Sequence, residues 1–207
     1  RCPWCGSKID SRQVKAKKSE RRVYVYCSDW KSDGCPFNEA GDGLPILTVD
    51  EEIYRLAPAF VIATVDKFAR LAREGEAASL FGYVSKQCDR HGYVHPDYSE
   101  CTVKDKHPAN GGLPPAAVRP AGRLRPPDLI IQDELHLISG ALGTTVGLFE
   151  VAIDTMCSWT DSDGRPVRPL LVASTATVRN APDHVRALYG RDVTVFPPQV
   201  LDVGNTF

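Results

Sequence analysis

Three short stretches of the chain are almost continuously apolar and stop abruptly at polar residues. The clearest begins after Pro127, a helix breaker, and runs from Leu129 to Ile131. An unbroken apolar run of this kind is typical of a strand buried on both faces of a parallel sheet. We therefore expect buried strands at residues 59–65, 129–131 and 169–174, and a final short strand at 192–196.

Between these runs, apolar residues recur at helical spacing. Residues 50–56 begin with three acids and stop before Pro58, which predicts a short helix. Further helices are expected at 66–73, from 143 to about 159, and at 179–189, where Gly190 ends the last one. The helix from 143 to about 159 has a buried stripe that places Cys157 in the core. Helices that alternate with apolar strands predict an α/β fold with a parallel sheet.

Two carboxylates, Asp133 and Glu134, follow the 129–131 strand directly. The carboxyl ends of strands in open α/β sheets line the crevice in which ligands bind. In nucleotide hydrolases an Asp at this position holds Mg²⁺, and a neighbouring Glu orients or activates the attacking water. The alternative is that both residues only begin and cap the next helix.

The composition narrows the function classes. Charge is balanced, with 25 basic and 26 acidic residues, so the chain as a whole is no basic clamp for nucleic acid, although a local groove can still be basic. No apolar run approaches membrane-spanning length and no signal peptide is visible, so we expect a cytoplasmic protein without membrane contact. The chain begins at Arg1 without Met, and we expect it to be part of a longer protein.

Four cysteines mark the first 40 residues as a zinc-ribbon-like element. Cys2 and Cys5 form a CxxC pair followed by Gly, and a polar-apolar alternation over 21–26 predicts a strand that leads into Cys27. Cys35 completes a four-thiolate set for structural Zn²⁺, although its distance from Cys27 is wider than the usual knuckle. Buried free thiols are the alternative, but the segment has few aliphatic residues for a metal-free core.

Residues 75–126 interrupt the α/β alternation with prolines and glycines, and we expect a loop-rich insertion. It contains Cys88, His91, Cys101 and His107. The first two have knuckle spacing, and Cys101 with either His107 or His95 would complete a second zinc site. A loop with dispersed Cys and His is the alternative. A basic cluster at 15–22 is typically a solvated surface, with nucleic-acid contact as the second interpretation.

Taken together, the motifs resemble those of superfamily 2 DExH-box helicases. Asp133-Glu134-Leu135-His136 matches the DExH box, and 174–177 (Ser-Thr-Ala-Thr) matches the Ser-Ala-Thr motif at the end of the following strand. The segment 63–68 stands where the family has a Thr-containing nucleic-acid motif. A Cys-rich element beside this box is similar to the large helicase subunits of DISARM anti-phage defence systems.

The resemblance implies a role for each matched residue. Asp133 would bind Mg²⁺, Glu134 would activate water, and His136 would couple the ATP site to nucleic acid. The hydroxyl groups of Ser174, Thr175 and Thr177 would link hydrolysis to domain movement. Thr64 and Lys67 would contact a phosphate of the nucleic acid. It also implies a partial RecA-like motor domain over 41–74 and 127–207, with nucleic acid as the partner (DNA favoured over RNA), together with defence-complex subunits.

The departures from the family are large. The sequence contains no GxxxxGK[ST] loop to cradle phosphates, and no second motor domain with arginine fingers. We therefore expect ATP hydrolysis only from the parent protein, with ATP and Mg²⁺ as its cofactors, and none from residues 1–207 alone. The alternative function is a zinc-ribbon module that binds nucleic acid or protein without nucleotide chemistry. A zinc hydrolase is disfavoured because no catalytic ligand set surrounds His136.

Overall fold

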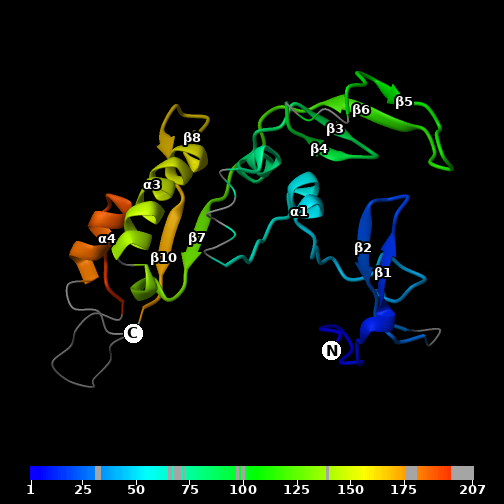
Figure 1. Ribbon diagram of the computed structural model, residues 1–207, viewed down its shortest axis with the longest axis horizontal. Coiled ribbons are helices and arrows are strands. Elements are labelled where there is room, and N and C mark those ends of the chain that lie inside the picture. Colours follow the sequence, from blue (N-terminus) through cyan, green and yellow to red (C-terminus); the bar gives the residue numbers. More distant parts are fainter. Residues whose placement is uncertain are drawn as a thin grey trace. The chain divides into compact units, whose positions relative to one another are not determined.

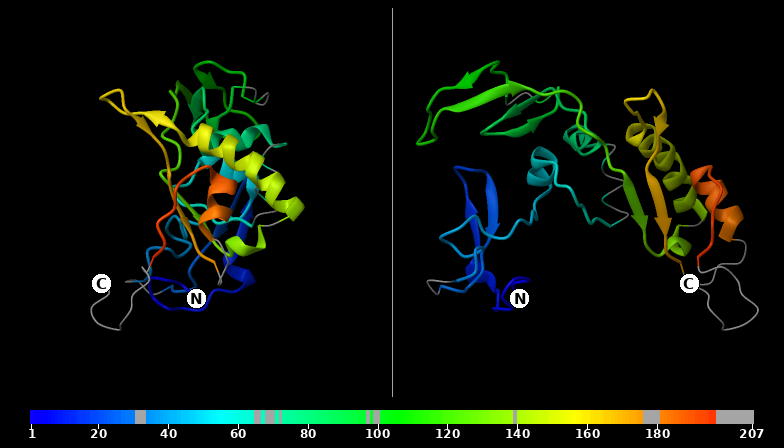
Figure 2. Two further views of the ribbon diagram at one scale, coloured as in Figure 1. Left: turned by 90° about the vertical axis from the view of Figure 1, so that its left-hand side faces the viewer. Right: turned by 180° about the vertical axis from the view of Figure 1, so that it is seen from behind.

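The computed structural model divides the chain into two compact units, Arg1–Arg125 (unit 1) and Pro126–Phe207 (unit 2). Figures 1 and 2 show the elements of each. The structure describes residues 1–30, 34–64, 67, 71, 73–96, 98, 101–138, 140–175 and 181–196. The expected domain boundaries, with a ribbon at 1–40 and an insertion at 75–126, stay a prediction.

Unit 1 opens with a small hairpin. A 3-10 turn, η1 (Ser11–Gln13), leads into β1 (Val14–Lys17), which pairs antiparallel with β2 (Arg22–Val25). The β2 strand confirms the expectation for 21–26. The buried core around the hairpin consists mainly of cysteines, because Val25 and Leu44 are the only aliphatic side chains among its described buried residues.

Helix α1 (Asp50–Leu56) confirms the predicted short helix, with its three acids in the first turn where the helix dipole favours them. It ends at Ala57, which takes the left-handed conformation (φ 43°) before Pro58. Glu52 is buried and its carboxylate accepts a hydrogen bond from the backbone N–H of Val23, which connects the helix to the hairpin.

The segment expected to be loop-rich contains more regular structure than its sequence indicates. After η2 (Gly75–Phe81) it forms a four-stranded antiparallel sheet in the order β4-β3-β6-β5. Strands of two to five residues are too short for a period-2 pattern to stand out among prolines and glycines. The bounds of these strands are Lys86–Cys88 for β3, Gly92–Val94 for β4, Lys106–His107 for β5 and Ala116–Pro120 for β6.

Unit 2 contains the predicted parallel sheet. Strand β7 (Leu129–Gln132) pairs in parallel with β10 (Leu170–Ala173). Helix α3 (Gly140–Cys157) lies between these two strands in the chain. A short turn η3 (Leu135–Leu137), the hairpin of β8 (Trp159–Thr160) and β9 (Pro166–Val167), and α4 (Ala181–Tyr189) complete the described elements. The buried stripe of α3 is confirmed at Ile153 and Cys157.

Two predictions from the sequence are wrong: that β7 and β10 are buried on both faces, and that residues 59–65 and 192–196 form strands. The side chains of Leu129, Ile131, Leu170 and Val172 are 45–64% exposed, because the described helices of unit 2 cover only the opposite face, where Ile130 and Leu171 lie. Residues 59–64 and 192–196 form no strand, and Phe60 and Ile62 are exposed. An apolar run supplies side chains for burial, but a strand also needs a neighbour for its backbone hydrogen bonds.

Some expectations fall outside the described residues. Of the helix expected at 66–73, only residues 67, 71 and 73 are described, and residues 179 and 180 of the last helix are not. In the described part of the chain, none of the helices combines the length and the apolar character needed to cross a membrane.

Candidate functional site

The first candidate metal centre lies in the hairpin element of unit 1. Cys2 and Cys5 flank a tight turn that closes when the N–H of Gly6 donates to the carbonyl of Cys2 at 2.9 Å. Gly6 adopts φ 75°, a conformation that favours glycine. Cys27 follows β2 directly, and its N–H donates to the carbonyl of Phe37 at 2.7 Å, which brings the Cys35 turn alongside.

The four sulfurs are arranged as a tetrahedral site requires. All lie within 4.8 Å of one another, with Cys2 and Cys35 Sγ 3.5 Å apart and Cys5 and Cys27 Sγ 3.4 Å apart. A disulfide would bring the sulfurs to about 2.05 Å, and all four cysteines are free. Tetrahedral zinc with Zn–S bonds of about 2.3 Å implies S–S edges of about 3.8 Å. The residues therefore fit Zn²⁺.

Burial and hydrogen bonding shift the pKa values of these thiols in opposite directions. Burial raises the pKa of the Cys35 thiol to about 12 and raises the pKa of Cys27. Hydrogen bonds from the side chain and backbone of Ser7 lower the pKa of the exposed Cys5 to about 6. A divalent cation would offset the cost of burying several thiolates in one place.

The second candidate centre consists of Cys88, His91, Cys101 and His107. Their ligand atoms also lie within 4.8 Å of one another, with Cys88 Sγ 3.4 Å from His91 Nδ1 and Cys101 Sγ 3.4 Å from His107 Nε2. Zinc bonds to sulfur and nitrogen imply an S–N edge of about 3.6 Å. His95, the other candidate for the fourth ligand, lies outside this set.

The small antiparallel sheet positions these ligands. Cys88 ends β3, His91 stands in the β3–β4 turn, and His107 belongs to β5. Lys86 donates to the carbonyl oxygens of Cys101 and Val103, which holds the loop that carries Cys101.

Burial affects the two kinds of ligand in this second cluster differently. Burial lowers the pKa of His107, which favours the neutral imidazole that binds metals. Burial raises the pKa of the Cys101 thiol, so that a nearby cation would be needed to hold it as a thiolate.

The candidate active site lies at the carboxyl ends of β7 and β10. Because Gln132 and Ala173 are level in the parallel register, the residues that follow them are neighbours. The Ser174 hydroxyl donates to the Asp133 carboxylate, and the N–H of Leu135 donates to the carbonyl of Ser174 at 2.9 Å. The hydrogen bond from Ser174, with that from the Glu134 N–H, lowers the pKa of Asp133.

Glu134 stands beside this contact in a left-handed conformation (φ 51°) that is uncommon outside glycine. Its side chain is exposed, and its Oε2 lies 3.2 Å from Nδ1 of His136. It makes no capping hydrogen bond to η3, and α3 begins only at Gly140. The structure thus disfavours the view that Glu134 only caps a helix.

The remaining predicted residues are not part of this contact. Thr175 is exposed after β10, and Thr177 lies outside the described residues. Thr64 is exposed in an irregular segment of unit 1, and Lys67 forms an ion pair with Asp50 in the same unit.

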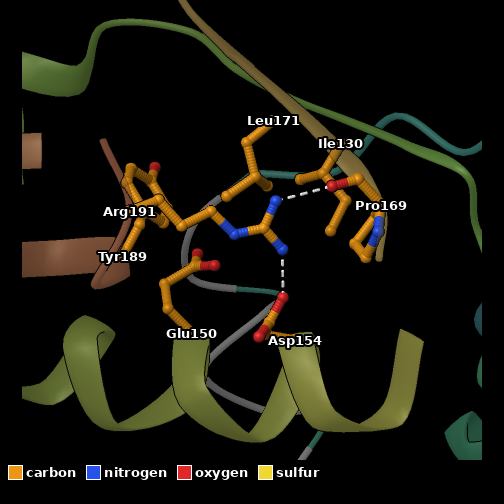
Figure 3. Close-up of a pocket in the computed structure, with 7 residues that line it drawn as sticks. All are labelled: Ile130, Glu150, Asp154, Pro169, Leu171, Tyr189 and Arg191. Atoms are coloured by element: carbon orange, nitrogen blue, oxygen red, sulfur yellow. Dashed lines mark hydrogen bonds and ion pairs between the residues drawn. The ribbon is translucent and has the colours of Figure 1, made fainter. Parts of the chain in front are cut away.

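Sequence reasoning missed a polar cluster beneath the sheet of unit 2 (Figure 3). The guanidinium of Arg191 points between the carbonyl of Pro169, at 2.7 Å, and the carboxylate of Asp154 on α3. Burial acts to raise the pKa of Asp154, but hydrogen bonds from Arg168 and Arg191 outweigh it and hold that pKa below its usual value. The nearby Glu150 has its pKa raised by burial. These contacts join α3 to the segment after α4. No residue spacing in the sequence predicts them.

No protein-family model matches the chain. The chain is 38% identical over 213 residues to a protein named DISARM protein DrmA from Bacillus paralicheniformis. The match covers the whole chain but only 18% of that relative.

Proposed function

We propose that this chain is part of a nucleic-acid-dependent ATPase of the DExH helicase type that acts in anti-phage defence. One observation carries the motor proposal: the Ser174 hydroxyl donates to the Asp133 carboxylate across the ends of two parallel strands. Residues 41 positions apart in the chain, each matching a different helicase motif, thereby meet. The likeness to DISARM protein DrmA supports the biological setting.

The geometry supports a different role for each of Asp133, Glu134 and His136 at the carboxyl ends of β7 and β10. Asp133 is exposed and its lowered pKa keeps it ionised at neutral pH, so it would hold Mg²⁺, which neutralises phosphate charge when bound. Glu134 is exposed beside it and would accept a proton from the attacking water. Contact with Glu134 would let His136 sense the state of that carboxylate.

In this proposal Ser174 is the coupling hydroxyl. A change in the charge or ligation of Asp133 would act first on the hydrogen bond from Ser174, and through it on the end of β10. Thr175, the next residue, would carry that change into the segment beyond the strand. Thr64 and Lys67 would contact nucleic acid, as the family resemblance implies.

Zinc in unit 1 would be structural. Each cluster presents four ligands, which fill a tetrahedral shell and leave no open position for a substrate. The cysteine and histidine residues would then hold the hairpin and the four-stranded sheet in shape. The same two clusters are the observation that favours the second candidate function, a zinc-dependent binding module without nucleotide chemistry.

The experiment compares ATP hydrolysis by the parent protein with that of its Glu134→Gln variant, with and without single- and double-stranded DNA and RNA. Loss of the general base is expected to lower stimulated turnover at least about a hundredfold. Asp163→Asn, which neutralises an exposed carboxylate in the β8–β9 turn, serves as the control and should leave turnover unchanged. Absence of turnover in the zinc-loaded parent under every condition would favour the binding module instead.

A further inference from the structure

The hairpin of unit 1 has one face that is both basic and aromatic. In the β1–β2 register, Lys15 lies opposite Tyr24 and Lys17 opposite Arg22, so these four side chains share a face. Lys17 Nζ lies 4.6 Å and Arg22 Cζ 4.4 Å from the centre of the Tyr24 ring. We call these residues the hairpin face. Cations that flank an aromatic ring are typical of surfaces that bind single-stranded nucleic acid.

The segment that contains this face is more basic than the chain as a whole. Residues 1–40 contain nine basic and five acidic residues, a net charge of +4, whereas the whole chain carries −1. Four thiolates with one Zn²⁺ would add about −2, which still leaves the segment positive. Lys15 and Lys17 each pair with one carboxylate, Glu39 and Glu20. The surface is therefore basic in excess of its internal ion pairs.

A cavity of about 270 Å³ opens where the hairpin turn meets α1 and β4. Its walls combine aromatic, cationic and anionic side chains, among them Tyr54, Tyr93, Tyr98, Arg21, Arg55 and Glu76. We call it the tyrosine cavity. Its volume is of the size that one nucleotide fills, and carboxylates on its wall would accept hydrogen bonds from the amino groups of a base.

The hairpin face and the tyrosine cavity are continuous through the turn. Arg55 Nη2 donates to the carbonyl oxygens of Glu20 and Arg21, at 3.1 and 2.8 Å, and Arg21 itself lines the cavity. Arg21 has φ 51°, and its Nη1 donates to the Tyr98 hydroxyl at 3.4 Å. Arg22 thus lies on the hairpin face and the adjacent Arg21 on the cavity wall.

We propose that the hairpin face and the tyrosine cavity bind single-stranded nucleic acid, with phosphates along Lys15, Lys17 and Arg22 and one unpaired base against Tyr93. A duplex would place its phosphates on the hairpin face but could not insert a paired base. A cationic peptide would meet Arg21 and Arg55 at the cavity and the net positive charge beside it. This interface deepens the proposed function, because it names the surface that would hold the strand.

The test measures binding of the zinc-loaded chain to fluorescein-labelled 12-nucleotide DNA and RNA, single- and double-stranded, by anisotropy over a range of salt concentrations. Lys15→Gln with Lys17→Gln should weaken binding roughly tenfold and lower the salt slope by about 1.4, since each phosphate contact to a single strand contributes about 0.7. Tyr93→Leu should weaken single-strand binding roughly tenfold or more without changing the salt slope.

Matched controls separate the interface from general charge or stability. Arg165→Gln with Arg186→Gln removes two exposed, ion-paired cations in unit 2, and Tyr83→Leu removes an exposed tyrosine of unit 1 outside the cavity. Both should bind as the unaltered chain does. Zinc content and thermal melting of every variant show whether the fold is retained.

Each outcome decides the proposal. Wild-type affinity in both interface variants, or displacement of the oligonucleotide by a poly-glutamate peptide at equal concentration, would overturn it. Asp163→Asn should bind the oligonucleotide normally, because it leaves unit 1 unaltered. If the unaltered chain fails to bind the oligonucleotide while the parent retains its ATPase activity, only the interface is defeated. If the unaltered chain binds but the parent shows no ATPase activity, only the motor is defeated.

Discussion

Replacing Cys101 with Ala is the sharpest test of the second metal centre. Cys101 is 1% exposed, and its sulfur lies 3.4 Å from His107 Nε2 in the cluster that gathers four ligand atoms. With one ligand gone, the site would lose the closed tetrahedral shell that gives structural zinc its affinity. The chain should then bind one zinc ion rather than two, because the hairpin cluster is unaltered.

The structure sets the size of the effect. The buried core around this cluster contains two aliphatic side chains, Val94 and Val118, besides the two cysteines. Full burial of a valine contributes about 1.5–3 kcal/mol, so both together contribute about 3–6 kcal/mol. Structural zinc contributes about 10–16 kcal/mol in zinc-finger peptides, so the metal would dominate the local stability. The sheet of β3 to β6 should therefore unfold locally in the variant.

Native mass spectrometry counts the zinc ions, and amide hydrogen exchange locates the unfolding. Protection should fall across residues 86–120 and stay unchanged across β7 and β10. Cys157→Ala is the control, since this equally buried cysteine of α3 belongs to neither cluster. It should keep two zinc ions and weaken only unit 2. Two zinc ions and undiminished protection in Cys101→Ala would refute the second centre.

Three further predictions test other parts of the chain. Gly92→Ala should destabilise unit 1 by about 2 kcal/mol or more in urea unfolding, because a Cβ at φ 80° would lie 2.2 Å from the carbonyl oxygen of Arg55; Gly111→Ala, with open space around it, should cost only about 1 kcal/mol. Because folding lowers the pKa of Asp154 from its unfolded value of 3.8, ionised Asp154 should stabilise unit 2 above pH 3.8, and this stabilisation should be lost as the pH falls through the folded pKa. In Asp154→Asn the melting temperature of unit 2 should therefore change less with pH in this acidic range. Ser174→Ala should reduce ATP hydrolysis by the parent roughly tenfold while leaving its zinc content unchanged, and equal turnover would exclude a coupling role.

Local signals predicted local structure well. The acids and Pro58 bounded α1 at the residues observed, and the apolar stripe placed Ile153 and Cys157 inside α3. The CxxC and CxxH spacings likewise indicated residues whose ligand atoms lie within 4.8 Å of one another, because a knuckle is a short turn whose geometry lies within a few residues. The fourth member of the second set was open between His107 and His95, and the pairing of β5 with β6 brings His107 into the cluster.

Features that depend on a distant partner could not be predicted in this way. The run at 59–64 has the composition of a buried strand, yet no strand in the described residues offers it hydrogen bonds, and Ile62 is 84% exposed. The same holds for the outer face of β7 and β10, whose apolar residues predicted burial on both sides. The tyrosine cavity likewise draws its walls from separate elements, so no single window of sequence contains it.

Register explains why the strand-end contact involves Ser174 rather than a neighbouring hydroxyl. Sequence alone left Ser174, Thr175 and Thr177 as candidates, because all three follow the same strand. In the parallel pairing Gln132 is level with Ala173, so the next residue of each strand, Asp133 and Ser174, must meet at the sheet edge. A shift of one residue would bring Thr175 to this position and turn every side chain of β10 to the other face, exposing Leu171 and burying Leu170. The packing of Leu171 toward α3 thus selects the hydroxyl that reaches Asp133.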